Sequence, residues 1–270
     1  MWGLILGAGY GRRMLPITER RAKPSLPFRG VPIIRQIVER LSPITFRIGI
    51  NLFYRPQDIV EALSGREVLF SLEQEILGTS GGVKKMVELF SIKDDIIVHN
   101  GDSLLFLDYN ELIKFHKKNG AMVTLVVSSP RENYTRFSVK NHKLNITEDG
   151  EYIYCGAMVI SSELLKEIPS GENIIKEFIV NQKIDVFPIE NFLEFTNPAS
   201  YLKKHGGITH IENGARVASD AIIEKSLVLK DASVSTGAVV LNSIIVSGEV
   251  SRGELIKDKI FIDGRTYPIS

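Results

Sequence analysis

The residues from about 208 to the end of the chain carry a six-residue repeat of aliphatic side chains. The repeated positions are Ile211, Val217, Ile223, Val228, Val234, Val240 and Val246, with a single step of five between Ile223 and Val228. A period of six fits neither a helix, which repeats every ~3.6 residues, nor an alternating strand. It predicts a triangular β-solenoid with one short strand per face and three hexads per coil.

Such a solenoid would be short, because the repeats suffice for only about two coils. A solenoid exposes strands at its end faces, so we expect this stub to pack on the rest of the chain or on a copy of itself. The exposed strands favour a homo-oligomer. A set of ordinary short strands is the alternative interpretation, and the regular spacing counts against it.

The first two-thirds of the chain alternate short apolar runs with longer amphipathic segments. The apolar runs predict strands over residues 3–6, 46–52, 68–72, 96–99 and 122–128. The amphipathic segments predict helices over residues 32–41, 57–63, 82–90 and 109–118. This βαβ rhythm predicts an α/β fold with a Rossmann-like, mainly parallel mixed sheet and helices on both faces. Ligands of such sheets bind beyond the carboxyl ends of the strands.

After Val127 the apolar runs become shorter and their connections tighter. Strands are predicted over residues 137–139, 152–154 and 157–160, as a β-rich insert and the far edge of the same sheet. Helices over residues 173–181 and 198–204 are expected to complete this part. The sequence thus predicts two domains, an α/β domain over residues 1–207 and the repeat stub over residues 208–270.

Charge and cysteine content narrow the classes of function. The formal net charge is +1, which offers no electrostatic case for binding nucleic acid or an anionic membrane surface. The N-terminus lacks the basic segment of a signal peptide, and no apolar stretch approaches the roughly 20 residues of a membrane span. The single cysteine, Cys155, is interpreted as a buried apolar residue rather than a nucleophile. A soluble cytoplasmic protein is expected.

A glycine-rich loop, LGAGYGRR, occupies residues 6–13 directly after the first predicted strand. Glycines there let the backbone approach a ligand and direct N–H groups at phosphate oxygens. By itself the pattern also fits a dinucleotide-dependent oxidoreductase or a simple tight turn. The next residues argue against the oxidoreductase, because residues 14–27 contain three prolines where an apolar helix would be needed. Arg13 and Lys23 in this stiffened segment suit a polyphosphate.

This opening resembles the signature of the sugar-nucleotidyltransferase (nucleotide-sugar pyrophosphorylase) family, with its glycine-rich loop, Arg, Pro and Lys-Pro pair. The resemblance implies that Arg13 contacts a nucleoside triphosphate and stabilises the transition state, and that Lys23 holds phosphate near the reacting centre. It also implies further nucleotide-binding residues, which are Leu6, Gly7, Ala8, Gly9, Gly11, Arg12, Gly78 and Thr79. Many relatives have Thr or Ser in place of Arg12, which either adds a phosphate contact or faces solvent.

Glu73 and the segment LGTSGG over residues 77–82 resemble the family's loop that reads the nucleobase. Backbone groups and Thr79 would bind the base edge, and Gly78 would permit its close approach. A helix N-terminus capped by Thr79 or Ser80 is a compatible alternative. Asn51 and the residues after it resemble the second strand and following helix, and are interpreted as framework.

Two acidic residues are the candidate metal ligands. Asp102 follows a predicted buried strand in the sequence IIVHNGD, and a turn-forming Asp is the alternative interpretation. Mg²⁺ prefers oxygen ligands, and a few carboxylates together with triphosphate oxygens suffice. The family's second acid, an Asp before Gly-Thr, corresponds here to Glu194, so the carboxylate extends one carbon further. His99 is interpreted as structural.

The candidate sugar site is Glu148 with Gly156. The segment YIYCGA over residues 152–157 resembles the strand whose glycine lets the sugar lie against the backbone. Glu148 corresponds to an acid that binds sugar hydroxyls, although Asp149 stands where relatives often have Lys.

The resemblance implies a Mg²⁺-dependent enzyme that joins a nucleoside triphosphate and a sugar 1-phosphate, releasing pyrophosphate. The base loop and the hexapeptide-repeat tail look most like mannose-1-phosphate guanylyltransferases, which implies GTP, mannose 1-phosphate and a left-handed β-helix for the tail. Use of UTP, dTTP, ATP or CTP remains open. The altered second acid keeps another class open, a catalytically weak regulatory subunit that binds nucleotide-sugar.

Overall fold

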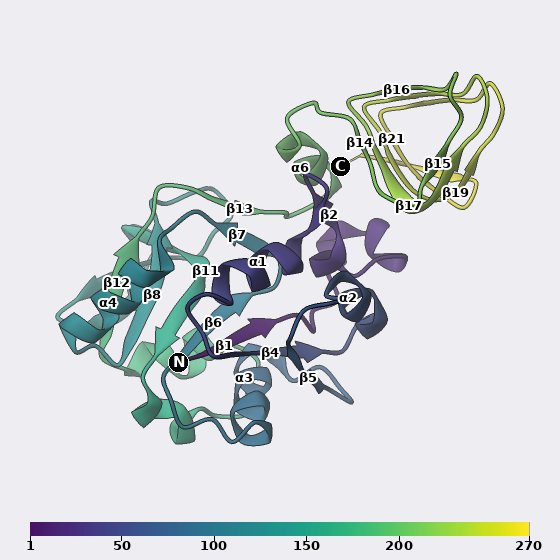
Figure 1. Cartoon of the computed structure of the whole chain (residues 1–270). Coiled ribbons are helices and arrows are strands. Elements are labelled where there is room, and N and C mark those ends of the chain that lie inside the picture. The colour runs from purple at the N-terminus through teal and green to yellow at the C-terminus, as the bar shows by residue number, and fades with distance from the viewer. Residues whose placement is uncertain (270) are drawn as a thin grey trace. The chain divides into compact units, whose positions relative to one another are not determined.

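The computed structural model describes residues 1–269, which form two compact units (Figure 1). The first unit consists of residues Met1–Gly9 and Ile34–Glu194. The second combines residues Tyr10–Ile33 with the chain from Phe195 onward. The glycine-rich loop is therefore divided between the two units after Gly9. The division predicted at residue 208 follows the change in sequence pattern and stays a prediction.

A nine-stranded mixed sheet forms the centre of the first unit. Its main path runs β10-β9-β11-β6-β1-β4-β5, and β8 pairs with β11 and β12. The strands are β1 (Trp2–Leu6), β4 (Arg47–Leu52), β5 (Leu69–Leu72), β6 (Ile96–Asn100), β8 (Val123–Ser128), β9 (Arg136–Lys140), β10 (Lys143–Ile146), β11 (Tyr152–Ile160) and β12 (Ile184–Pro188). The central strands β6, β1, β4 and β5 are parallel, as predicted, and β11 runs antiparallel to β6.

Helices cover both faces of this sheet. The helices of the first unit are α1 (Ile33–Leu41), α2 (Pro56–Ala62), α3 (Gly78–Leu89), α4 (Tyr109–Asn119) and α5 (Ile174–Glu177). Leu4 of β1 packs in one core cluster with Val83 and Met86 of α3, while its neighbour Ile5 points to the opposite face and is also fully buried. Because neighbouring strand residues point to opposite faces, burial of both requires cover on both sides. The predicted fold class is confirmed.

The predicted helix boundaries hold where the apolar spacing is clear. In α1, the five aliphatic residues that share a face are all 0–1% exposed, namely Ile33, Ile34, Ile37, Val38 and Leu41. The predicted start of α3 at residue 82 is wrong, because the helix begins at Gly78. A Cβ atom on Gly82 would lie 2.6 Å from Nδ2 of Asn51. Glycine is needed there for close packing, although glycine-rich sequence usually indicates a loop.

Two other predicted elements differ from the structure. The two strands expected over residues 152–154 and 157–160 are one strand, β11, with an irregular register between Tyr154 and Met158. The single helix expected over residues 173–181 is a short α5 followed by a 3₁₀ turn over Ile179–Asn181. Phe178 separates them with φ −126° and ψ −56°, which is outside helical geometry.

In the second unit, residues 10–33 form short turns instead of a regular helix. Three 3₁₀ turns span Arg12–Met14, Ile17–Glu19 and Lys23–Ser25, and a small hairpin of β2 (Pro27–Phe28) and β3 (Val31–Pro32) follows. The prolines account for this, because each removes a backbone donor and prevents a continuous helix. Helix α6 (Pro198–Lys204) has the predicted bounds, and the side chain of Asn197 caps its N-terminus by accepting from N–H of Ser200 at 2.8 Å.

The rest of the second unit is a solenoid whose strands, except β22, stack in parallel (Figure 1). Its strands are β14 (His210–Ile211), β15 (Arg216–Val217), β16 (Ile222–Glu224), β17 (Leu227–Val234), β18 (Val239–Leu241), β19 (Ile244–Val250), β20 (Leu255–Lys257), β21 (Lys259–Ile262) and β22 (Arg265–Pro268). On one face Ile211 pairs with Val228, Val228 with Ile245, and Ile245 with Phe261. The left-handed winding implied by the resemblance stays a prediction.

The coils are shorter than three full hexads. The paired positions advance by 17, 17 and 16 residues, which makes three coil lengths rather than the two expected. The position equivalent to Val228 in the next coil is Ile245, so the predicted assignment of Val246 is wrong. One corner of each coil is tightened by a residue with positive φ, at Lys225, Asn242 and Asp258. This corner shortens the repeat, and β22 then folds back antiparallel on β21.

The lowered pKa values of two buried histidines lead us to expect that the stability of the fold depends on pH. His99 is fully buried, its Nε2 lies 3.0 Å from the hydroxyl of Tyr109, and burial lowers its pKa from 6.5 to about 4. Burial likewise lowers the pKa of His205 to about 4. Between pH 4 and 6.5 the unfolded chain therefore binds more protons than the folded chain, so stability falls as the pH falls through this window.

For His99 alone we expect a loss of about 2 kcal/mol between pH 7 and pH 5. Urea unfolding at the two pH values measures it, with His99→Gln as the comparison. The variant has lower stability at pH 7 but a smaller loss on acidification. An equal loss in both proteins would contradict this assignment.

Candidate active site

Two candidate segments of the first unit, the glycine-rich loop and the loop that bears Asp102, follow the carboxyl ends of neighbouring parallel strands. Leu6 pairs with Asn51 of β4 on one side and with Asn100 of β6 on the other, so the loops after β1 and β6 begin side by side. The N–H of Gly101 donates to the carbonyl of Leu6 at 2.9 Å. A Cβ atom on Gly101 would lie 2.6 Å from that oxygen, so glycine is needed for this approach.

A buried hydrogen-bond network anchors the glycine-rich loop. Oδ1 of Asn51 accepts from N–H of Gly7 at 2.8 Å, and its Nδ2 donates to Oε1 of Glu73 at 2.7 Å. Oε2 of Glu73 accepts from N–H of Leu77 at 3.2 Å. Asn51 and Glu73 are 3% and 4% exposed. Asn51, interpreted from sequence as framework, thus joins the loop after β1 to the loop that precedes α3.

The segment predicted to read the nucleobase is held by the chain itself. The hydroxyl of Thr79 donates to the carbonyl of Glu172 at 3.1 Å and accepts from N–H of Ile174 at 3.0 Å. A Cβ atom on Gly78 would lie 2.4 Å from Cα of Glu172, so the close approach at this glycine is made by the backbone at Glu172. The predicted capping of the α3 N-terminus by Thr79 or Ser80 is wrong, because α3 begins at Gly78 and both residues lie inside the helix. The base-binding role of Gly78 and Thr79 stays a prediction.

The two candidate metal ligands lie on neighbouring backbone segments. A two-stranded ladder of β7 (Ser103–Leu105) and β13 (Phe192–Glu194) pairs Glu194 with Ser103, the residue after Asp102. Across residues 1–269, no group of three or more His, Cys, Asp or Glu side chains could hold a metal ion. Two carboxylates nevertheless fit Mg²⁺, which commonly binds one or two protein carboxylates and takes its other ligands from phosphate and water.

Glu194 has a short hydrogen bond to a residue that the sequence did not indicate. The hydroxyl of Tyr134 donates to Oε2 of Glu194 at 2.5 Å. Burial and this bond raise the pKa of Tyr134 well above its usual value, so the phenol keeps its proton. The hydroxyl of Ser103 is buried nearby, and no partner for it occurs in the described part of the chain.

The residues proposed for the sugar are Gly156, in the middle of β11, and Glu148, in the turn before that strand. Gly156 has φ +102°, which favours glycine, and a Cβ atom there would lie 2.5 Å from Oγ of Ser103 and 3.2 Å from Nδ2 of Asn100. Its close neighbours are thus residues on either side of Asp102. Glu148 is exposed in the turn after β10, and its carbonyl lies 3.5 Å from Nη1 of Arg136.

Cys155 is buried, as expected. Burial of the thiol raises its pKa to about 12, against a smaller opposing effect of the charge of Arg131. A thiol that keeps its proton is a poor nucleophile, in line with the interpretation of Cys155 as a structural residue.

In the second unit, the basic residues lie in the 3₁₀ turns after the glycines. Arg12 and Arg13 are exposed, and the guanidinium of Arg12 stands 5.0 Å from the centre of the Tyr10 ring. Lys23 is only 6% exposed. Gly11 has φ +63°, and a Cβ atom there would lie 3.2 Å from Cβ of Lys23. Glycine at this position thus lets the two turns pack closely.

Contacts with the C-terminal part of the unit hold this basic segment. The guanidinium of Arg21, whose side chain is 5% exposed, binds both carboxylate oxygens of Glu212 at 3.2 Å. The hydroxyl of the fully buried Tyr201 donates to the carbonyl of Pro27 at 2.5 Å. Sequence reasoning missed these residues, because no local pattern links positions so far apart.

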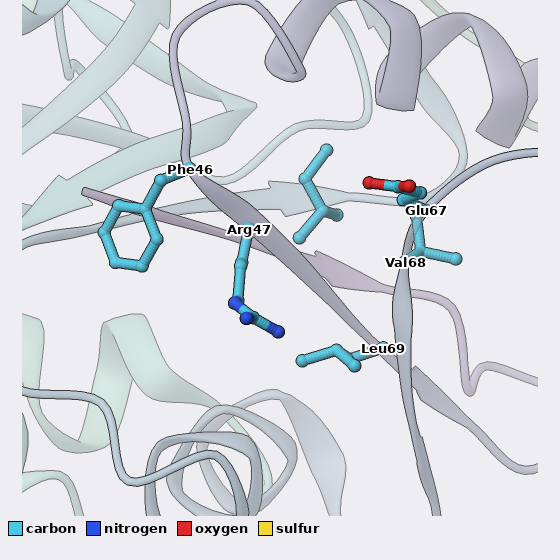
Figure 2. A pocket seen from close by; sticks show the side chains of 6 residues that line it. Phe46, Arg47, Glu67, Val68 and Leu69 are labelled. Carbon is cyan, nitrogen blue, oxygen red and sulfur yellow. The ribbon is translucent and has the colours of Figure 1, made fainter.

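One cavity of the first unit lies away from these residues (Figure 2). It has a volume of about 340 Å³ and is lined by Phe46, Arg47, Ile48, Glu67, Val68 and Leu69. These residues stand at or before the start of β4 and β5, whereas Gly7 and Asp102 follow the carboxyl ends of β1 and β6. The cavity therefore belongs to the opposite edge of the sheet.

Comparisons with known proteins agree with this fold. Residues 2–146 match the family model described as nucleotidyl transferase, and the chain belongs to this family. The mannose-1-phosphate guanyltransferase of Yarrowia lipolytica is 35% identical over 162 residues, covering 57% of this chain and 44% of that protein. Mannose-1-phosphate guanyltransferase 2 of Candida glabrata is 28% identical over 260 residues, covering 83% and 72%. The UTP–glucose-1-phosphate uridylyltransferase of a Synechocystis species is 28% identical over 201 residues, covering 64% and 52%.

The matched region covers less than half of the length of the Yarrowia lipolytica relative and about half of that of the Synechocystis relative. Among solved structures, HddC from Yersinia pseudotuberculosis superposes with a TM-score of 0.65 at 22% identity, covering 76% of this chain and 98% of that one. This likeness supports the fold. Within residues 1–269, no helix is long and apolar enough to cross a membrane.

Proposed function

We propose that the chain transfers a nucleotidyl group from a nucleoside triphosphate to a sugar 1-phosphate, forming a nucleotide-sugar and pyrophosphate. The observation that carries the proposal is the bond between Gly101 and Leu6, which joins the glycine-rich loop to the segment bearing Asp102 at one edge of the sheet. The matching family model and the names of the relatives support it.

In the proposed reaction, an oxygen of the sugar 1-phosphate attacks the α-phosphorus and the bond to the β-phosphate breaks. Pyrophosphate leaves with that electron pair, so no protein nucleophile is required. Arg13 and Lys23 neutralise charge on the phosphates, and the backbone from Leu6 to Gly9 positions the nucleoside. Mg²⁺ bound by Asp102 and Glu194 supplies further positive charge to the triphosphate when it is present.

For the substrates, the proposal is GTP and mannose 1-phosphate, with the sugar bound at Glu148 and Gly156. Its support is the number of mannose-1-phosphate guanyltransferases among the relatives. A uridylyltransferase occurs among them too, so UTP, dTTP, ATP and CTP belong in the test. We further propose that the exposed strands of the solenoid join copies of the chain, which light scattering would test.

A second candidate is a catalytically weak subunit that binds nucleotide-sugar. The observation in its favour is Glu194 in place of the family's Asp. The first experiment therefore measures pyrophosphate release with Mg²⁺ and all pairs of five nucleoside triphosphates with a panel of sugar 1-phosphates. Release that requires one pair supports the enzyme and identifies its substrates. Nucleotide binding without release from any pair would contradict the enzyme and support the subunit.

A further inference from the structure

The connection between β8 and β9 carries Tyr134 to one of the candidate metal ligands. Its hydroxyl donates to Oε2 of Glu194 across 60 residues of sequence, at 2.5 Å. A hydrogen bond from a neutral hydroxyl to a carboxylate is short and strong. One oxygen of Glu194 is therefore held by the chain.

Two aromatic contacts hold the same connection against β13. The ring of Tyr134 packs edge to face on the ring of Phe192, with centroids 6.0 Å apart. The guanidinium of Arg131 stands 4.1 Å from the centre of the Phe192 ring. Phe192 is 3% exposed and belongs to the strand that ends at Glu194. The position of the Tyr134 hydroxyl is thus set by packing that does not depend on its bond to Glu194.

A glutamate needs such support more than an aspartate does. Its side chain has one more rotatable bond, so its carboxylate samples more positions and loses more conformational freedom when it binds a metal. The groups that hydrogen-bond a metal ligand orient it and set its affinity. We infer that Tyr134 is a positioning residue that orients Glu194 for binding the divalent cation, and this inference rests on the proposed function. In this role Tyr134 compensates for the longer acidic side chain at this position.

The test measures the dissociation constant of Mn²⁺ by electron spin resonance. Wild type and variants are mixed with Mn²⁺ and the panel triphosphate that wild type binds most tightly, with no sugar phosphate. Tyr134→Phe keeps the ring on Phe192 and removes only the hydroxyl, so we expect a native thermal unfolding curve and Mn²⁺ binding weakened about 10- to 100-fold. Tyr267→Phe, which removes a tyrosine hydroxyl from β22, serves as the control. It is expected to leave the Mn²⁺ affinity unchanged.

A double-mutant cycle shows whether Tyr134 acts through Glu194. Glu194→Asp withdraws the carboxylate by about 1.5 Å, beyond hydrogen-bond reach of Tyr134. In that background Tyr134→Phe is expected to change the Mn²⁺ affinity less than about twofold. An equal loss in both backgrounds would overturn the inference, because Tyr134 would then act by another route.

Two further outcomes separate this inference from the proposed function. If Asp102→Ala loses Mn²⁺ while Tyr134→Phe binds it as wild type does, the role of Tyr134 is overturned and the metal site stands. If a mixture of wild type and nucleotide binds no more Mn²⁺ than the nucleotide alone, both the metal site and the role of Tyr134 are overturned.

Discussion

Asp102→Ala is expected to reduce pyrophosphate release by about three orders of magnitude or more, while the fold stays intact. The loss follows from removing a carboxylate proposed to hold the metal ion, whose charge stabilises the transition state. Asp102 lies in the turn between β6 and β7 and is partly exposed, so its replacement leaves no large cavity. Release is measured with the substrate pair that the screen identifies.

Asp108→Asn provides the matched control. Asp108 is exposed six residues further along, and its side chain caps α4 by accepting from N–H of Asn110 at 2.8 Å. Asparagine caps helices equally well, so this variant loses a nearby charge without loss of structure. We expect near wild-type release from it. An active Asp102→Ala protein would remove Asp102 from the mechanism.

Glu212→Ala is expected to lower the free energy of unfolding by about 3–5 kcal/mol. Both oxygens of Glu212 bind the guanidinium of Arg21, and Oε2 also accepts from the backbone N–H of Lys230 at 2.9 Å. Without the carboxylate, a buried cation loses its main partner, which is costly in a medium of low dielectric constant. Urea unfolding measures the change.

The adjacent ion pair of Arg20 and Asp263 is the control, because both side chains are about half exposed. Asp263→Ala should change the stability by less than about 1 kcal/mol. Glu212→Ala should also weaken nucleotide binding, since Arg21 lies two residues before Lys23 in the segment proposed to hold phosphate. Equal effects of the two variants would contradict a special role for the buried pair.

Elements with a clear local period were predictable, and elements without one were not. The apolar face of α1 follows from side chains at helical spacing, so the prediction is correct within one residue. The start of α3 was missed because Gly82 faces Asn51 from another strand, and local sequence cannot express that contact. The 17-residue coil was missed for a similar reason, since the tight corner at Asn242 removes a residue from the hexad count.

The candidate site likewise contains some residues that the sequence could predict and others that it could not. The glycine-rich loop and Asp102 were found because each follows an apolar strand directly, and the sheet then places both at its carboxyl edge. Tyr134 stands in a polar connection without any motif, and its partner lies 60 residues away. The hydroxyl of Thr79 was expected to face a base, yet it bonds to the backbone of residues 172 and 174.

The sequence by itself therefore determined the family, the order of strands and helices, the repeat of the tail and the chemical types of the proposed ligands. These depend on spacing between near neighbours, because hydrophobic periodicity and glycine or proline geometry act over a few residues. Only the tertiary structure decided that Tyr134 holds Glu194 and that Arg21 binds Glu212. Each of these contacts joins segments far apart in the chain, and their packing alone brings the side chains within hydrogen-bond distance.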